Sequence, residues 1–190
     1  MEIRNATEAD VPLILRFIRD LAIYEKLEHI VIATESGLRQ SLFGNPRFAE
    51  VIFASIDGVE VGFALFFHNY STFLGQPGIY LEDLFVKPEM RGRGVGKALL
   101  AHLALLAKER GCGRLEWAVL KWNTPSIEFY KSIGAVAMDD WSVFRLTGDA
   151  LDDLAANSCD EDRHVLCIPS RDGSSAQLRE SRRRPSAAPS

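Results

Sequence analysis

Cysteine and long hydrophobic runs are scarce in this 190-residue chain. Its three cysteines, Cys112, Cys159 and Cys167, are odd in number and fit neither a metal-ligand spacing nor a paired spacing, so we expect reduced thiols. No hydrophobic run approaches the ~18 residues of a membrane span, and the first residues lead into strand-like sequence rather than a signal peptide. We therefore expect a cytoplasmic protein without a membrane partner.

A strong charge of either sign is also missing, since 22 Lys and Arg stand against 26 Asp and Glu. The basic residues before position 156 are scattered, so we expect no nucleic-acid partner. The four histidines form no cluster with metal-ligand spacing, and we assign no metal site. The net charge of −4 suits a small cationic substrate.

The composition, 47% hydrophobic and 25% charged, is ordinary for a soluble globular protein. Hydrophobic periodicity disappears from Asn157 onward, where Ser, Pro and Arg dominate. We predict one folded domain over residues 1–155 and a disordered tail over 156–190. The run Arg182-Arg183-Arg184 falls short of a basic patch, and we interpret it as part of a solvated tail.

Periodicity and turn residues predict alternating strands and helices. Thr34 is placed to cap a helix, Asp57-Gly58 between two β-rich runs is a strong hairpin signal, and Thr124-Pro125 suits the N-cap and N1 positions of a short helix. This order predicts a mixed α/β sheet with helices on its faces. The predicted strands are 3–6, 51–56, 61–67, 79–86, 115–120 and 143–146. One predicted helix follows Thr7 and another begins at Thr124, and the remaining helices span 35–43, 95–110 and 149–155. Residues 69–78 are predicted to form a loop.

The most informative stretch, Arg91-Gly92-Arg93-Gly94-Val95-Gly96-Lys97, joins a predicted strand to a predicted helix. Alternate glycines there expose backbone N–H groups, and a helix N-terminus attracts anions. A P-loop needs glycine at Arg91 and a hydroxyl residue at Ala98, and a dinucleotide fingerprint needs glycine or alanine at Lys97, so both alternatives fail. Two interpretations of this stretch remain. It is either a site for a diphosphate-bearing ligand or, more simply, a turn that only caps a helix.

Two ordered motifs resemble the GNAT N-acetyltransferase superfamily. The stretch Arg91 to Gly96 is similar to its acetyl-CoA loop, Gln or Arg-x-x-Gly-x-Gly or Ala, and follows Leu81-Glu82-Asp83-Leu84-Phe85-Val86; residues 122–135 resemble its asparagine-to-tyrosine segment. The resemblance covers residues 1–155. It implies an α/β (α+β) fold with a mixed, mostly antiparallel sheet, splayed central strands and helices on both faces. It also implies acetyl-CoA as co-substrate, no metal, and a homodimer.

Within that superfamily the chain looks closest to the diamine (spermidine/spermine-like) acetyltransferases and their bacterial relatives. The residues that carry this similarity are 21–28, Tyr80-Leu81-Glu82-Asp83 and 122–134. The polyamine enzymes have an acidic residue followed shortly by tryptophan before the Glu-Asp strand, whereas this chain has Ser71-Thr72-Phe73. This departure leaves other primary amines open as acceptors.

The resemblance assigns the donor-binding residues to three segments. Backbone N–H groups of the 84–86 segment would stabilise the carbonyl oxygen if a bulge frees them from the sheet. Asn123 would bond the pantetheine or pyrophosphate side, with a plain turn role as the alternative. The full set is Leu84, Phe85, Val86, Arg91, Gly92, Arg93, Gly94, Val95, Gly96, Lys97, Asn123, Ser126 and Tyr130.

Acetyl transfer to an amine needs a base, because an alkylammonium with a pKa near ~10.4 has no free lone pair. Strand alternation lets only one of Glu82 and Asp83 reach the acceptor, and we favour Glu82, through a water; the alternative is a solvated acidic pair. Tyr130 would protonate the leaving thiolate, with a core tyrosine as the alternative.

Recognition of a cationic acceptor would fall to Tyr24, Glu25, Glu82 and Asp83, through charge pairing and cation–π contact. The alternative for Glu25 is a solvated helix face. Trp122 is interpreted as a packing residue. The predicted function is acetyl-CoA-dependent N-acetylation of a primary amine on a small cationic acceptor by direct attack in a ternary complex. The alternatives are a protein or peptide N-acetyltransferase and a non-catalytic acyl-CoA-binding module.

Overall fold

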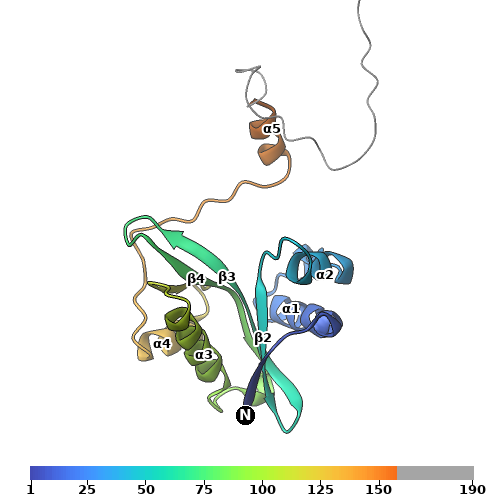
Figure 1. Ribbon diagram of the computed structural model, residues 1–190, viewed down its shortest axis with the longest axis vertical. Helices are drawn as coiled ribbons and strands as arrows, with labels where there is room; N and C mark the ends of the chain where they lie inside the picture. The colour runs from blue at the N-terminus through green and yellow to red at the C-terminus, as the bar shows by residue number, and fades with distance from the viewer. Residues whose placement is uncertain (158–190) are drawn as a thin grey trace, which may run out of the picture. The chain divides into compact units, whose positions relative to one another are not determined.

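The computed structural model describes residues 1–157 (Figure 1). The helices and strands occur in an order that matches a mixed α/β architecture. In chain order they are β1 (Glu2–Asn5), η1 (Glu8–Asp10), α1 (Val11–Glu25), η2 (Glu28–Ile30), α2 (Glu35–Phe43), β2 (Glu50–Ile56), β3 (Val59–Ser71), β4 (Gln76–Val86), η3 (Pro88–Met90), α3 (Val95–Glu109), β5 (Leu115–Trp117), α4 (Thr124–Ser132) and α5 (Asp149–Asn157).

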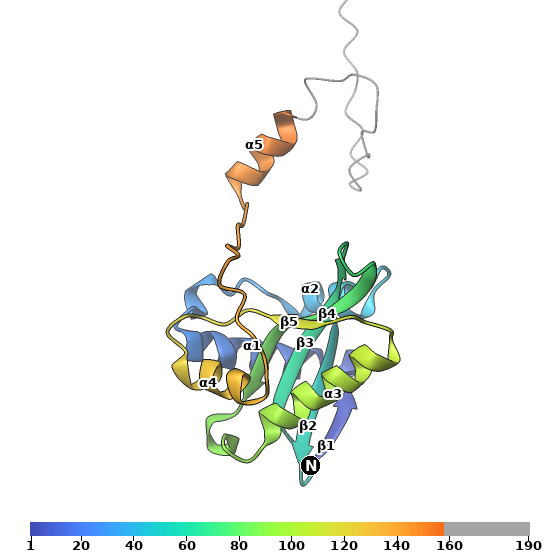
Figure 2. The ribbon, with the colours of Figure 1, turned by 90° about the vertical axis from the view of Figure 1, so that its left-hand side faces the viewer.

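One sheet of five strands, in the order β1-β2-β3-β4-β5, forms the centre of the molecule. All neighbouring strands are antiparallel except β4 and β5, which are parallel. Helices α1 and α2 cover one face of the sheet, and α3 crosses the other (Figures 1 and 2). This confirms the predicted mixed, mostly antiparallel sheet with helices on both faces.

Each face of the sheet has its own hydrophobic core. On the α3 face, Leu99 and Leu103 are fully buried against the strands, as their spacing on one helical stripe predicts. On the α1 and α2 face, the Phe17 ring lies 5.2 Å from the Phe63 ring and 5.7 Å from the Phe53 ring, measured between centroids. Both faces are therefore held by packed side chains that fix the position of β4 between them.

Strand β4 carries the irregularity that matters most for function. Phe66 pairs with Leu81, but the next β3 residue, Leu65, pairs with Asp83, so Glu82 is the extra residue of a β-bulge. On its other side β4 pairs with β5 only from Ile79 to Leu81. Beyond Leu81, the β5-facing edge of β4 has no strand partner among the described residues.

Local sequence signals located several elements correctly. Helix α2 has the predicted bounds, and the Thr34 hydroxyl accepts a hydrogen bond from the Gly37 N–H at 3.1 Å. The β2–β3 turn places Asp57 and Gly58 at φ 52° and 76°, as a tight hairpin requires.

Other predicted elements were wrong. The predicted loop at 69–78 is mostly strand, because β3 and β4 pair up to Ser71 and Gln76 and leave only a short turn between them. Strand β5 ends at Trp117 rather than Leu120. Asn123, not Thr124, is the N-cap of α4, and its side chain makes no capping hydrogen bond.

The strand predicted at 143–146 is absent from the described residues, although that segment is apolar. A strand needs a partner, and no strand among residues 1–157 pairs with it. Residues 1–136 form one compact unit, and the described residues from 137 onward belong to a second. The domain boundary at 155 stays a prediction, while Cys159, Cys167 and the Arg182–Arg184 run lie outside the described residues.

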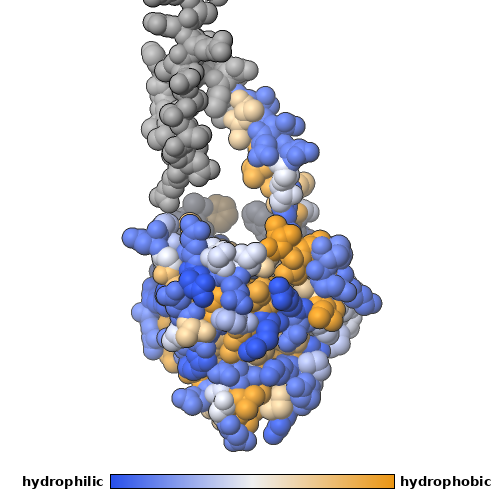
Figure 3. All heavy atoms as spheres, turned by 90° about the vertical axis from the view of Figure 1, so that its right-hand side faces the viewer, coloured by the Kyte–Doolittle hydropathy of each residue, from blue (hydrophilic) through white to orange (hydrophobic). Residues whose placement is uncertain are grey.

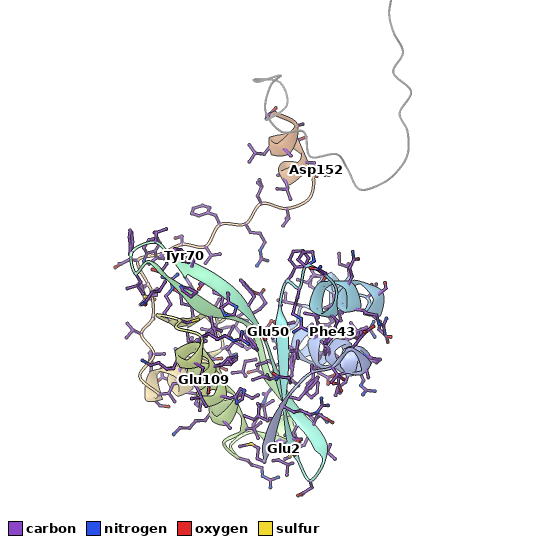
Figure 4. All side chains as sticks on the ribbon, in the orientation of Figure 1. Glu2, Phe43, Glu50, Tyr70, Glu109 and Asp152 are labelled. Carbon is purple, nitrogen blue, oxygen red and sulfur yellow. The ribbon has the colours of Figure 1, made fainter. Side chains whose placement is uncertain are left out.

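The part of the chain that the structure describes contains no helix of the length and apolarity needed to cross a membrane. Two small cavities, of about 120 and 220 Å³, lie beside α2 and the start of β2, and both are lined by Arg47 and Glu50. Figure 4 labels Glu50 and Phe43 at this place. The Arg110 guanidinium already pairs with the Glu50 carboxylate, so Glu50 is not free to bind a ligand there.

Candidate active site

The glycine-rich loop presents backbone N–H groups at the start of α3. Gly92 and Gly94 have φ values of 73° and 82°, and a side chain would be strained there although space is open around both. Within α3 the first hydrogen bond runs from the Ala98 N–H to the Gly94 carbonyl, at 3.0 Å. The N–H groups of residues 95–97 therefore have no intrahelical acceptor, which fits a bound diphosphate.

The loop side chains lie in different places. Val95 is buried in the α3 core, whereas Lys97 is exposed. Arg93 donates to the Met90 sulfur at 3.4 Å. Arg91 points back toward the sheet, where its Nε donates to the Val86 carbonyl at 3.1 Å. The loop therefore exposes its backbone N–H groups at the start of α3, while the Arg91 guanidinium is directed away toward the sheet.

Next to the loop, the parting of β4 and β5 opens the edge of β4. Leu84, Phe85 and Val86 pair with β3 on one side, and β5 has ended on the other. The bulge expected within this 84–86 segment is instead at Glu82. Because β5 has ended, the edge of the 84–86 segment that faces away from β3 has no strand partner among the described residues.

Tyr130 comes from α4 and reaches this region from the side of β5. Its ring packs edge-on against Trp117 with centroids 5.1 Å apart. Burial, and then the charges of Tyr24 and Glu25, raise the pKa of the Tyr130 hydroxyl. The phenol therefore holds its proton at neutral pH, as a proton donor must. Ser126 lies one helical turn earlier on α4.

Tyr24, near the end of α1, connects three segments. Its hydroxyl donates to the buried Asn123 side-chain oxygen at 3.1 Å, and its ring lies 5.9 Å from the Trp122 ring. The Arg91 guanidinium lies over the same ring at 4.2 Å from the centroid. Asn123, which the resemblance assigns to donor binding, thus contacts Tyr24 through its side-chain oxygen.

Two carboxylates lie beside this cluster without a cationic partner. Among residues 1–157, neither Glu25 nor Asp83 receives a hydrogen bond or forms an ion pair. Burial, followed by the charges of Glu82 and Glu25, raises the pKa of Asp83 to about 6. Burial also raises the pKa of Glu25. Glu82 itself is exposed. The result is a part-buried acidic site that a cation would neutralise.

Most of the residues in this cluster were named from the sequence, but two features of it were not predicted. Trp122, interpreted as a packing residue, does pack against Tyr24, but it is 52% exposed and borders this cluster. Its position directly before Asn123 was the available signal. The second feature is the Arg91–Tyr24 stack, which links the glycine-rich loop to α1 and has no sequence signature.

Ser71, the first residue of the altered Ser-Thr-Phe loop, closes the β3–β4 turn by accepting a hydrogen bond from Leu74 N–H at 3.2 Å. Phe73 is 92% exposed. No group of three or more His, Cys, Asp or Glu side chains within residues 1–157 is placed to hold a metal ion. Figure 3 views the molecule from the α1 and α2 side, where hydrophilic residues cover most of the surface.

Comparison with known proteins agrees with this geometry. The acetyltransferase (GNAT) family model matches residues 19–135, which include Tyr24, the glycine loop and Tyr130. The chain belongs to the GNAT acetyltransferase family. That family uses acetyl-CoA as co-substrate, and the protein is an N-acetyltransferase.

Several relatives share most of the chain. It is 40% identical to thialysine N-epsilon-acetyltransferase of Bos taurus, over 80% of this chain and 96% of the relative. It is 35% identical to L-ornithine N5-acetyltransferase of Arabidopsis thaliana, over 78% of this chain and 85% of the relative. Among solved structures, an integron cassette protein from the V. cholerae mobile metagenome aligns with a TM-score of 0.69 at 30% identity, over 81% of this chain and 96% of that one.

Proposed function

We propose that this enzyme acetylates a primary amine on a small cationic acceptor, by direct attack within a ternary complex. The observation that carries the proposal is the pair of carboxylates, Glu25 and Asp83, that have no cationic partner beside the donor site. An unpaired, part-buried carboxylate is costly, and a cationic ligand removes that cost. The names of two relatives, which act on ornithine and thialysine, support the same class of acceptor.

Donor binding would use the backbone. The N–H groups at the start of α3 and along the 84–86 edge would hold the diphosphate and polarise the carbonyl, with Gly92 and Gly94 allowing close approach. The exposed Arg93 and Lys97 would add positive charge nearby. Bound acetyl-CoA would supply an activated acetyl thioester.

Acceptor binding would use the acidic cluster. Glu25, Glu82 and Asp83 would attract the ammonium groups, and Tyr24 would border them through its ring. One carboxylate of the Glu82-Asp83 pair would take the ammonium proton; in the sequence Glu82, acting through a water, is the candidate. Tyr130 would give its proton to the departing thiolate and recover one from the new amide nitrogen.

We further propose that the enzyme is a cytoplasmic homodimer. The homodimer rests on the resemblance to the diamine acetyltransferases, and the location on the expectation from the sequence given above.

The test measures thiol release from acetyl-CoA with the purified full-length chain. We expect turnover with ornithine, thialysine and diamines, and none with the same compounds after their amines are acetylated. Turnover with peptides alone would favour a protein N-acetyltransferase. Tight acetyl-CoA binding with no turnover on any amine would contradict the proposal and favour a binding module.

A further inference from the structure

The bulge in β4 decides which of two adjacent carboxylates faces the acceptor side. Leu81 lies in the α3 core, and without a bulge Glu82 would pair with Leu65 and point to the α1 face. The extra residue shifts the alternation by one position, so Asp83 takes that place. Leu65 and Phe85, the neighbours of Asp83 in this register, both belong to the α1-side core.

The surroundings of Asp83 leave its carboxylate available to a ligand. Glu82 on its own strand and Glu25 on α1 are both acidic and repel it. Arg91, the cation of the nearby loop, is held over the Tyr24 ring and on the Val86 carbonyl. On α4, Tyr130 is kept protonated by its own burial and by the charge of Glu25.

Lys87, which directly follows β4, is a second cation of this region. Its Nζ lies over the Phe17 ring, 5.7 Å from the centroid, and forms no ion pair with a described residue. No described cation therefore neutralises Asp83, and an incoming ammonium would do so.

We propose that Asp83, rather than Glu82, directly accepts the proton of the acceptor ammonium. This inference rests on the proposed function. The proton passes from the ammonium nitrogen to an Asp83 carboxylate oxygen, which leaves a neutral amine and a neutral carboxylic acid. The nitrogen lone pair then forms the C–N bond as the C–S bond breaks, Tyr130 exchanges one proton between nitrogen and sulfur, and Asp83 releases its proton to solvent.

The burial of Asp83 supports this role. Burial raises the pKa of Asp83 from 3.8 to about 6. Proton transfer from an ammonium to Asp83 is therefore about a hundredfold more favourable than transfer to an ordinary aspartate. At neutral pH the group is still mostly ionised, so it can act as a base. Glu25, whose pKa burial also raises, lies on α1 and contributes negative charge that favours binding of the cation.

Asp83→Asn and Glu82→Gln are matched tests, since each replaces a carboxylate by the amide of the same shape. We expect Asp83→Asn to lower kcat by ~10²-fold or more, whereas Glu82→Gln, at a carboxylate that would attract the ammonium, should act mainly by raising KM for the acceptor. In wild type, kcat/KM should show an acid limb near pH 6. In Asp83→Asn the limb near pH 6 should vanish. Because only the neutral amine can then react, kcat/KM should instead rise tenfold per pH unit up to the pKa of the amine.

An acceptor whose amine has a lower pKa provides a second measurement, because it should recover much of the lost rate only in Asp83→Asn. Affinity for acetyl-CoA, measured by calorimetry, should be unchanged in both variants and shows that they fold. Loss of rate in Glu82→Gln with an unchanged Asp83→Asn would overturn the inference. An inactive wild type would instead contradict the proposed function, so the two failures are distinguishable.

Discussion

The donor side and the acceptor side proposed for this enzyme are formed in different ways. The donor side is formed by consecutive residues, 91–97, whose backbone N–H groups are exposed by glycines with positive φ. The acceptor side gathers side chains from α1, β4 and the start of α4, namely Tyr24, Asp83 and Asn123. Recognition of the donor is thus a matter of local chain conformation, whereas recognition of the acceptor depends on tertiary packing.

The two sides also differ in their effect on stability. Gly92 and Gly94 adopt conformations that glycine reaches without strain, so the donor loop costs little. Asp83 and Glu25 are part-buried acids without partners, and they lower stability in the absence of a ligand. The proposed acceptor site therefore coincides with carboxylates that have no cationic partner among the described residues.

Loss of the proposed proton donor, Tyr130, should have the largest effect on kcat. Tyr130→Phe removes the proton donor for the thiolate and should lower kcat by ~10²-fold or more, with the Kd for acetyl-CoA nearly unchanged. Steady-state rates and calorimetry measure both. Tyr70→Phe, at the exposed β3 position labelled in Figure 4, is the matched control and should change neither. An undiminished rate in Tyr130→Phe would remove this residue from the mechanism.

Backbone recognition on the donor side predicts the next effect. Gly94→Val forces a β-branched residue to φ 82°, and should weaken acetyl-CoA binding roughly 10-fold or more, measured as Kd. Gly58→Val imposes similar strain at φ 76° in the β2–β3 hairpin, with equally open space around it. That control should lower stability without changing the Kd. Equal losses of affinity would mean that general destabilisation, not the loop, is responsible.

Side-chain recognition on the acceptor side predicts a smaller, substrate-dependent effect. Glu25→Gln keeps the shape but removes a charge facing the ammonium, and should raise KM for a dicationic acceptor roughly 5- to 10-fold. The exposed Glu28→Gln change, three residues away, should leave KM unaltered. If both variants behaved alike, the effect would be one of net charge.

The unpaired Asp83 carboxylate should lower the free energy of unfolding at neutral pH. The pKa of Asp83 is raised on folding, so the folded state binds a proton more strongly, and stability falls as the pH rises from about 4 to about 6. Asp83→Asn should therefore raise the free energy of unfolding at pH 8 by roughly 1 kcal/mol, less than the full shift implies because water still reaches the group.

Denaturant unfolding at pH 8 and pH 4.5 measures this gain, which should shrink at the lower pH. Asp10→Asn is a control, because it should change the free energy of unfolding in the opposite direction. The Arg4 guanidinium holds the pKa of Asp10 well below its usual range, so that change should destabilise the protein at pH 8. A destabilised Asp83→Asn protein at pH 8 would argue against an unpaired carboxylate.

Local patterns were enough to predict several elements. Thr34 before α2 and the Asp57-Gly58 turn act within a few residues, and their predicted positions were confirmed. Predictions failed where pairing across the sheet overrides local preference. The polar segment 69–78 becomes strand because β3 and β4 support each other, and the apolar segment 143–146 forms no strand because it has no partner within residues 1–157.

By itself the sequence determined the family and the glycine-rich loop proposed to bind the donor, because spacing and glycine conformations are local properties of consecutive residues. It also supplied the adjacent acids Glu82 and Asp83. Only the tertiary structure decided which of them faces α1, since a single bulge in β4 reverses the alternation and depends on pairing with Leu65 and Phe66. A one-residue shift in strand register changes the face of every following side chain, and no local signal records it.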